Sequence, residues 1–392
     1  MDYISALEAS KKWSVSLRQV QRLLAGGRIP GAKKYGRSWM LPADAKKPGD
    51  LRRKKKPLPN ALSDDLCGVI SATTVPMSLH NPDAILNTVT DRRLQLIYEG
   101  ELAYLRGDFR RTLRCFYEAE GDDAARLRSC TTAIAAAISL GDYDAYTEIE
   151  AYLKTFVKTG EEGNVKAFAE LALATAAVSV IAPNMAPGWL KDGDFDALVP
   201  QMKPDALYLR AKYLNCVGSI EAMLAVAQTA LTLSAPERGI TMPDIYLRMT
   251  CAVACHTLGR EEEARRYLLG AMRICLPHGF LTPFAELVAA LGGLAEQCLE
   301  QEFPGYRDAV IGQWQLTWRN WVAFHNLFTK DHITLMLSLR EYHLAVKVAR
   351  RIPYADIAEQ HHLSVGRLKN IMLEIYGKLL ISGRDELSKY VL

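Results

Sequence analysis

The chain has 392 residues and a formal net charge of +4, and its composition is 49% hydrophobic, 23% charged and 8% aromatic. This composition excludes wholesale disorder, and no apolar run reaches the roughly 18 residues of a membrane span, so we expect no membrane partner. Domains take roughly 100–200 residues each, which predicts two to four of them. The eight cysteines form no C-x-x-C pair, and the N-terminus has no signal-peptide pattern. These features favour reduced thiols in a cytoplasmic protein.

Charge is distributed unevenly along the chain. Residues 1–60 hold 15 Lys and Arg against 4 Asp and Glu, residues 61–336 have a net charge of −10, and residues 337–392 have one of +3. The Lys, Arg and Pro run within residues 51–90 predicts a basic linker, followed by an irregular segment. Two basic ends around an acidic middle indicate that both ends contact a polyanion. Charge alone leaves nucleic acid, anionic lipid and an acidic protein open.

The first 24 residues predict two short helices. Capping boxes at residues 5–8 and 16–19 mark the helix starts, because Ser and Glu or Gln side chains satisfy the free amides there. Leu17, Val20 and Leu24 share one face of the second helix, and polar side chains lie off that face. A short helix pair with an apolar back and a basic front is typical of a helix-turn-helix. Its candidate DNA-contacting residues are Arg18, Gln21 and Arg22.

Residues 32–42 predict a β-hairpin, because Gly36 supplies the positive φ of a tight turn and the flanking residues suit strands. Cations near its tip are the candidate phosphate contacts: Lys33, Lys34 and Arg37. The helix pair, the run R-I-P-G-A at 28–32 and the run G-R-S-W at 36–39 together resemble the winged helix-turn-helix of excisionase and MerR-type proteins. The resemblance implies a DNA-binding domain over residues 1–50.

The middle of the chain contains a repeat. G-D-F at 107–109 and G-D-Y at 141–143 are 34 residues apart, which is the period of tetratricopeptide helix pairs. Gly218 and Gly259 resemble later turns of the same kind. We therefore predict a TPR-like α-solenoid over residues 91–330.

Residues 252–284 resemble the helical repeats that precede LuxR-type domains in MalT-like regulators. A solenoid offers a concave surface, so an unknown effector of this region is a candidate partner; the alternative is that the repeats only space and dimerise the two ends. Trp314, Trp318 and Trp321 follow at helical spacing. This aromatic stripe is typical of a buried core, and the alternative is a helix that couples the repeats to the C-terminal domain or to a second copy.

Residues 335–392 predict a second helix-turn-helix domain. A capping box at residues 338–341 opens its first helix, and Ser364 caps its third. A single apolar stripe runs along the third helix: Leu368, Met372, Ile375 and Leu379. Three polar side chains lie off this stripe near the helix N-terminus, where recognition helices carry base-reading residues: Arg367, Lys369 and Asn370.

This stretch resembles the four-helix LuxR-type helix-turn-helix without gaps. The matching runs are L-S-x-R-E at 337–341, D-I-A-E-Q at 356–360, L-S-V-x-x-L-K-N at 363–370, I-Y-x-K-L at 375–379 and I-S-x-R-x-E-L at 381–387. The resemblance implies that Lys369 and Asn370 face bases and that Arg367 lies beside the DNA backbone. The Gly, His and Gly that are usual in the family are replaced here by three other residues: Arg351, Ile371 and Leu380.

The chain lacks the G-x-x-x-x-G-K-[ST], H-E-x-x-H and G-x-S-x-G motifs, so we expect no enzyme activity, no metal and no cofactor. His361 and His362 adjoin a turn, where we expect solvated side chains. The predicted fold is mainly α, with a winged helix-turn-helix, a solenoid and a LuxR-type unit. The predicted function is a bacterial transcription regulator that binds double-stranded DNA, with RNA polymerase as a further candidate partner. The LuxR resemblance implies a homodimer. The alternatives are an excisionase-like architectural recombination factor and a repeat-based protein-interaction scaffold.

Overall fold

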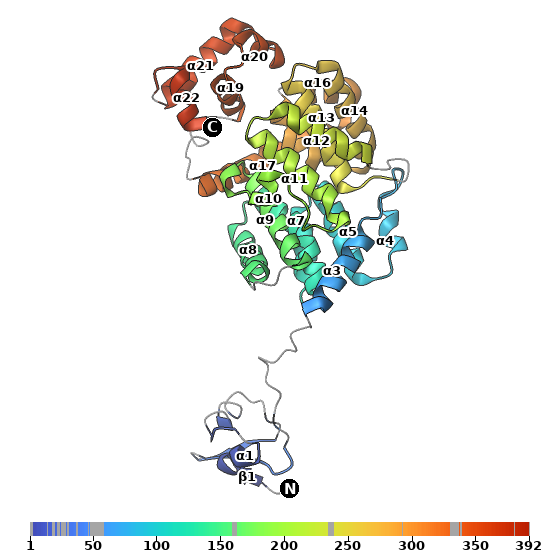
Figure 1. Ribbon diagram of the computed structural model, residues 1–392, viewed down its shortest axis with the longest axis vertical. Helices are drawn as coiled ribbons and strands as arrows, with labels where there is room; N and C mark the ends of the chain where they lie inside the picture. The colour runs from blue at the N-terminus through green and yellow to red at the C-terminus, as the bar shows by residue number, and fades with distance from the viewer. Residues whose placement is uncertain are drawn as a thin grey trace. The chain divides into compact units, whose positions relative to one another are not determined.

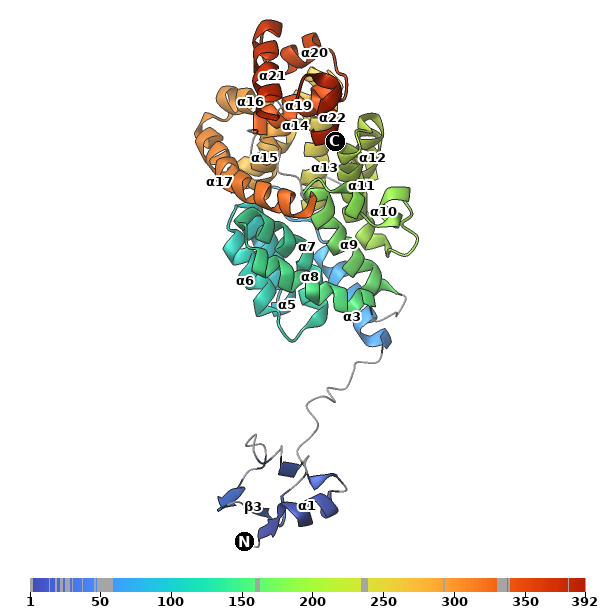
Figure 2. The ribbon, with the colours of Figure 1, turned by 90° about the vertical axis from the view of Figure 1, so that its left-hand side faces the viewer.

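The computed structural model of the chain is mainly helical, with a small three-stranded sheet near the N-terminus (Figures 1 and 2). It divides into two compact units, Met1–Pro59 and Asn60–Leu392. The residues that the structure describes are 3–13, 15–17, 20–21, 24, 29, 31–36, 38–45, 47, 59–158, 163–233, 239–291, 293–329, 337, 339–379 and 381–391. Within this part of the chain, none of the helices combines the length and the apolar character that a membrane span requires.

The N-terminal unit combines a short helix with three antiparallel strands in the order β1-β3-β2. Its elements are β1 (Tyr3–Ser5), α1 (Ala6–Lys12), β2 (Lys33–Tyr35) and β3 (Ser38–Pro42). The predicted capping box at the start of α1 is confirmed: the Glu8 amide donates to Ser5 Oγ at 3.2 Å, and the Ser5 amide donates to Glu8 Oε2 at 2.8 Å. The sequence pattern does not predict β1, which pairs with β3 and ties the start of α1 to the hairpin.

The predicted hairpin is confirmed, because Tyr35 pairs with Ser38 and Gly36 has a φ of 59° in the turn between them. The predicted second helix is described in part, and residues 17, 20, 21 and 24 are helical. Val20 and Leu24 are buried in a small core together with Ala9, Ile29 and Leu41. Leu17 is 37% exposed and lies at the edge of the predicted apolar face.

The second unit begins with two helices in a segment that we expected to be irregular. These are α3 (Pro59–Thr73) and α4 (Ala84–Thr88), so the prediction for this part of residues 51–90 is wrong. Leu66, Val69 and Ile70 repeat at helical spacing and are buried in the core of the unit. The local sequence pattern of this segment is weak, but burying apolar surface contributes about 25 cal/mol per Å² to stability, and this burial stabilises the helix. Residues 51–58 of the predicted basic linker lie outside the described residues.

Eight helices of the described chain form four consecutive pairs: α5 (Arg92–Leu105) with α6 (Phe109–Glu118), α7 (Asp123–Leu140) with α8 (Tyr143–Lys158), α11 (Lys203–Cys216) with α12 (Ile220–Leu233), and α13 (Met242–Thr257) with α14 (Glu261–Cys275). The turn inside each pair contains a predicted turn glycine with a φ between 70° and 82°: Gly107, Gly141, Gly218 and Gly259. Glycine adopts this left-handed conformation without strain, and the four predicted turns are confirmed.

Further elements connect or follow these pairs. Between the second and third pair lie α9 (Asn164–Ser179), η1 (Pro183–Met185), α10 (Gly188–Asp192) and η2 (Pro200–Met202), and after the fourth pair come η4 (Leu276–His278), α15 (Thr282–Leu287), η5 (Val288–Leu291) and α16 (Leu294–Glu302). In both views the helix pairs follow one another along the second unit (Figures 1 and 2). Their inward faces form one continuous hydrophobic core.

Helix α17 (Pro304–Thr329) runs past the C-terminal ends of α5, α7 and α9 (Figure 2). Gly107 has a φ of 82°, which favours glycine, and a Cβ there would lie 2.6 Å from the side-chain oxygen of Gln313, which would have to move. The Asn320 amide donates to the Ser139 carbonyl at 2.8 Å, and Trp321 Nε1 donates to the Ser179 carbonyl at 2.7 Å. These donors satisfy carbonyl groups that the ends of α7 and α9 leave free.

The last four helices pack around a core of their own. They are α19 (Leu339–Ala349), α20 (Tyr354–Gln360), α21 (Val365–Leu379) and α22 (Arg384–Val391). All four residues of the predicted apolar stripe on α21 are buried, which confirms the stripe. The Arg367 amide donates to Ser364 Oγ at 3.1 Å, so the predicted cap of this helix is also confirmed. Ser338, the predicted cap of the first helix, lies outside the described residues.

Candidate nucleic-acid interface

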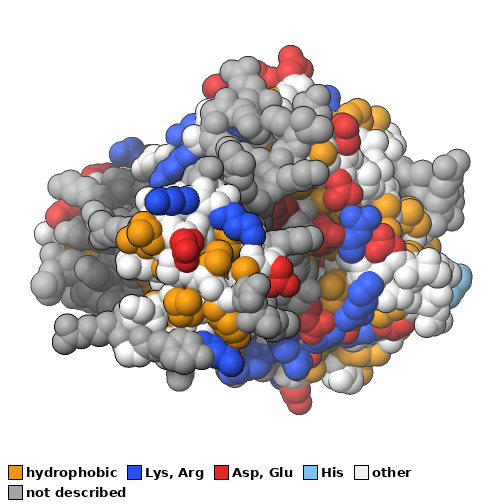
Figure 3. Space-filling view, turned by 90° about the horizontal axis from the view of Figure 1, so that it is seen from below, with side chains coloured by type: hydrophobic (Ala, Val, Ile, Leu, Met, Phe, Trp, Pro, Cys, Tyr) orange, Lys and Arg blue, Asp and Glu red, His pale blue; other side chains and the backbone are white. Residues whose placement is uncertain are grey.

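Strand β2 places the two described wing cations on opposite faces of the sheet. Lys33 pairs with Met40, and its ammonium lies 5.7 Å from the centre of the Tyr3 ring. Lys34 pairs with Trp39, and its ammonium lies 5.8 Å from the centre of that ring. Successive side chains of a strand point to opposite faces, so the two lysines, predicted as one group near the tip, separate. Both are exposed. Figure 3 shows one face of the molecule, on which Lys and Arg side chains lie among apolar ones.

The remaining predicted residues of the N-terminal unit are only partly described. Gln21 is exposed on the second helix. Arg18, Arg22 and Arg37 lie outside the described residues. The described part of this surface therefore consists of one amide and two cations, and neither lysine forms an ion pair with a described residue.

Helix α21 exposes its three predicted DNA-contacting residues together. Arg367, Lys369 and Asn370 are exposed in its first two turns, while Leu368 between them is buried in the core. Within the described chain, no hydrogen bond or ion pair engages these three side chains. An exposed helix start with free Arg, Lys and Asn side chains has the donors that recognise phosphates and base edges.

The two described departures from the LuxR pattern have different consequences. Ile371 is partly buried against the core of the C-terminal helices, so it does not extend the exposed row of Lys369 and Asn370. Arg351 has a φ of 61°, which lies in the left-handed region that favours glycine. A non-glycine residue in this region costs roughly 1–2 kcal/mol, so the turn is formed under strain. Leu380 lies outside the described residues.

The C-terminal helices contact the helix pairs through α19 and through the turn before α21. Arg350 Nη2 donates to the Asn215 carbonyl at 3.3 Å, at the end of α11. His362 Nε2 lies 2.9 Å from Gln297 Nε2 of α16. The contacts that the structure describes between these parts do not involve Arg367, Lys369 or Asn370, so docking leaves the start of α21 exposed.

The histidine pair is partly buried, which corrects the expectation of two solvated side chains. His361 is 6% exposed, and burial lowers its pKa to about 3, so its imidazole is neutral at pH 7. His362 is exposed. Close by, Lys347 Nζ donates to Gln360 Oε1 at 2.8 Å, and burial lowers the pKa of this ammonium to about 8. In the described part of the chain, no three His, Cys, Asp or Glu side chains are placed to hold a metal.

No sequence motif marks a cavity that lies next to α19. Its walls come from α5, α7, α9, α11, α15, α17 and α19, which are far apart in the chain. Trp314 and Trp321 pack on the core as predicted for an aromatic stripe, yet with Trp318 they also line this cavity. Tyr342 of α19 lines it as well, which favours the alternative of a helix that couples the repeats to the C-terminal helices.

Comparisons of the chain with protein-family models, with curated proteins and with solved structures found no match. The functional assignment therefore depends on the residues of this chain alone.

Proposed function

We propose that the chain is a bacterial, sequence-specific transcription regulator with two DNA-binding modules. Residues 1–50 form a winged helix-turn-helix, residues 335–392 form a LuxR-type helix-turn-helix, and the TPR-like repeats between them form a scaffold. In this proposal each module holds phosphates with Lys and Arg and inserts one helix into a major groove. The partner is double-stranded DNA.

The observation that carries the proposal is the exposed start of α21. Arg367, Lys369 and Asn370 lie together on a capped helix, without intramolecular partners in the described chain. Because these three side chains have no partners in the described chain, they add no ion pair or hydrogen bond to the stability of the C-terminal helices. Arg and Lys pair with guanine or phosphate, and Asn pairs with adenine, so the same three side chains suit a base-reading helix.

The N-terminal unit supports the proposal through a different element. The β2–β3 hairpin presents Lys33 and Lys34 beside a helix whose inward residues Val20 and Leu24 are buried. A hairpin wing with cations adds phosphate contacts beside the groove that the helix occupies. Two modules on one chain bind adjacent sites with a high effective concentration, so each can be weak alone.

An unbiased selection of duplex oligonucleotides with the full chain tests this function. We expect enrichment of a sequence motif, and we expect Lys369→Ala with Asn370→Ala to change the enriched bases. Enrichment of no motif at moderate salt would contradict sequence-specific binding. Binding that lacks sequence preference would instead favour the architectural recombination factor.

A further inference from the structure

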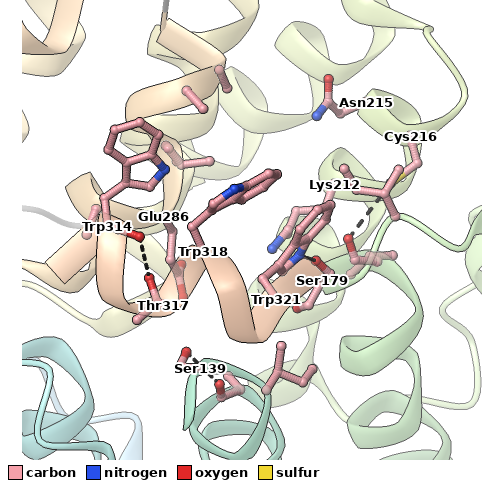
Figure 4. A pocket seen from close by; sticks show the side chains of 18 of the residues that line it. Ser139, Ser179, Lys212, Asn215, Cys216, Glu286, Trp314, Thr317, Trp318 and Trp321 are labelled. Carbon is pink, nitrogen blue, oxygen red and sulfur yellow. Dashed lines mark hydrogen bonds between the residues drawn. The ribbon is translucent and has the colours of Figure 1, made fainter. Parts of the chain in front are cut away.

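A cavity of about 180 Å³ is lined by residues of α17, the end of α11 and α19. Figure 4 shows its α17 and α11 sides. Its walls are mostly apolar, and in Figure 4 the Trp318 ring stands between those of Trp314 and Trp321. Trp318 and Trp321 stack with ring centres 5.0 Å apart. A cavity of about 150 Å³ holds one benzene molecule, so this one has room for an aromatic ring with a short side chain.

The α11 side of this cavity is cationic. Lys212 lines it and forms no ion pair with a described residue; its ammonium lies 5.6 Å from the centre of the Tyr208 ring. Arg350 is not among the residues that line the cavity; it donates to the carbonyl of Asn215, which does line it. Burial raises the pKa of Cys216 to about 11, and the positive charges of Lys212 and Arg350 partly oppose this rise.

The carboxylate that lines the same cavity already has a partner. Glu286 accepts a hydrogen bond from the Tyr104 hydroxyl, which is buried. Burial lowers the pKa of Lys212, but its interactions with Tyr208 and Glu286 outweigh burial, so the pKa of this ammonium is raised and it is charged at pH 7. Lys212 is the one Lys or Arg among the described residues that line the cavity, and a buried cation gains from a directly paired anion, so the α11 side of the cavity can accept one.

We infer that this cavity binds a small aromatic carboxylic acid, with its ring against Trp318 and its carboxylate on Lys212. Aromatic walls and a few convergent polar groups are the usual composition of a small-molecule site. The carboxylate supplies a charge-assisted hydrogen bond to the Lys212 ammonium. The ring fills a space that the indoles of Trp314, Trp318 and Trp321 line.

The position of the cavity gives this ligand a regulatory role. Tyr342 and His343 of α19 line it together with Trp314, Trp318 and Trp321 of α17. A ligand that contacts both helices stabilises the docked arrangement of the C-terminal helices by its binding free energy. The effect on DNA binding rests on the proposed function, whereas ligand binding itself does not.

Calorimetry with the full chain tests the ligand class. The probes are benzoate, 3-phenylpropionate and 4-hydroxyphenylacetate, each compared with its primary amide. We expect at least one acid to bind about tenfold or more tightly than its amide, because hydrogen bonds to charged groups contribute about 1.5–3 kcal/mol. Absence of binding by all three acids at millimolar concentration would overturn the inference, and so would equal affinity for acid and amide.

Two substitutions test whether the ligand binds in the cavity. Lys212→Met keeps the length of the side chain and should abolish the preference for the acid, while Lys203→Met on the same helix is the matched control and should keep it. Trp318→Leu should weaken acid and amide together. Thermal unfolding checks that each variant is folded, and unchanged acid affinity in folded Lys212→Met would overturn the assignment.

Hydrogen exchange tests, without DNA, whether the ligand stabilises the docked arrangement of the C-terminal helices. Exchange in residues 339–349 should slow when the acid binds, and unchanged exchange would contradict this stabilisation. In a separate titration the acid should change the affinity of the full chain for duplex DNA. If the acid binds and no duplex DNA is bound with or without it, the proposed function fails while the ligand site stands.

Discussion

Arginines within the helix pairs form ion pairs with carboxylates of neighbouring helices, whereas several exposed cations at the two ends of the chain form none with described residues. Arg111 Nη2 lies 2.6 Å from Glu99 Oε1, and Arg128 Nη2 lies 2.7 Å from Glu101 Oε1. These guanidinium groups connect neighbouring helices of α5, α6 and α7. By contrast, four exposed cations of the terminal units have no ion pair with a described residue: Lys33, Lys34, Arg367 and Lys369.

The comparison separates two uses of positive charge. In the middle of the chain carboxylates outnumber cations, so an arginine finds an internal partner and the surplus negative charge repels DNA. At the two ends of the chain the four cations named above have no such partner among the described residues and stay available for phosphates. Substitutions of the first group should therefore change stability, and substitutions of the second should change DNA binding.

The largest expected effect is on the buried pair. Arg128 and Glu101 have side chains only 11% and 7% exposed, so Arg128→Met leaves a buried carboxylate without its partner. We expect a loss of about 3–5 kcal/mol in the free energy of unfolding, measured by urea denaturation. Arg92, whose ion pairs are exposed, is the matched control, and Arg92→Met should cost less than about 1 kcal/mol. Equal losses of unfolding free energy in the two variants would contradict the proposed difference between the buried and the exposed ion pairs.

The next effect concerns the start of α21. Lys369→Ala with Asn370→Ala should reduce affinity for the selected duplex by about 30-fold or more, because each good base contact contributes about 1–3 kcal/mol and two are removed. Unfolding should be unchanged, since neither side chain has a described partner. The control is Lys378→Met on the same helix, whose ammonium lies 2.6 Å from Glu341 Oε1. It should alter stability and leave affinity for the duplex unchanged; the reverse pattern would contradict the assignment of this surface.

A smaller and less selective effect is expected at the wing. Lys33→Ala with Lys34→Ala should weaken binding to selected and unrelated duplexes alike, and should reduce the slope of log K against log salt by about 1–2. The reason is that phosphate contacts release counterions and carry no base information. Gel-shift titrations at several salt concentrations measure both quantities. A loss confined to the selected sequence would show that the wing reads bases instead.

The smallest effect is a gain in stability at a strained turn. Arg351→Gly removes a side chain with a φ of 61° and should raise the free energy of unfolding of the C-terminal helices by about 1 kcal/mol. Its ion pair with Asp385 is exposed on both sides and contributes little. Affinity for DNA should be unchanged, which separates this exposed arginine from Arg367. Lower stability, measured by thermal unfolding, would show that the turn is not strained.

Local signals in the sequence predict much of the helical architecture. The Ser5 and Ser364 caps, the hairpin turn at Gly36 and the four turn glycines each act within a few residues, so the pattern alone places them. Helix α3 is missed because its apolar face acquires meaning only when it is buried against the rest of the unit. Of the candidate interface, the exposure of Lys369 and Asn370 follows from the apolar stripe beside them.

The features that depend on distant segments were beyond sequence reasoning. Strand β1 completes the sheet by pairing with β3, which is far away in the sequence, and no local pattern marks it. His361 is buried although it adjoins a turn, and no pattern in the sequence marks it as different from the exposed His362. The cavity joins Lys212, Trp318 and Tyr342 from three helices, and no spacing in the chain relates them.

The salt dependence of duplex DNA binding by the full chain tests the central claim most directly. Each phosphate contact contributes about −0.9 to the slope of log K against log salt. If three residues contact phosphates, namely Lys33, Lys34 and Arg367, the slope should be steeper than about −2 per chain. A flat dependence, with the protein folded, would mean that the unpaired cations of the terminal units do not meet DNA.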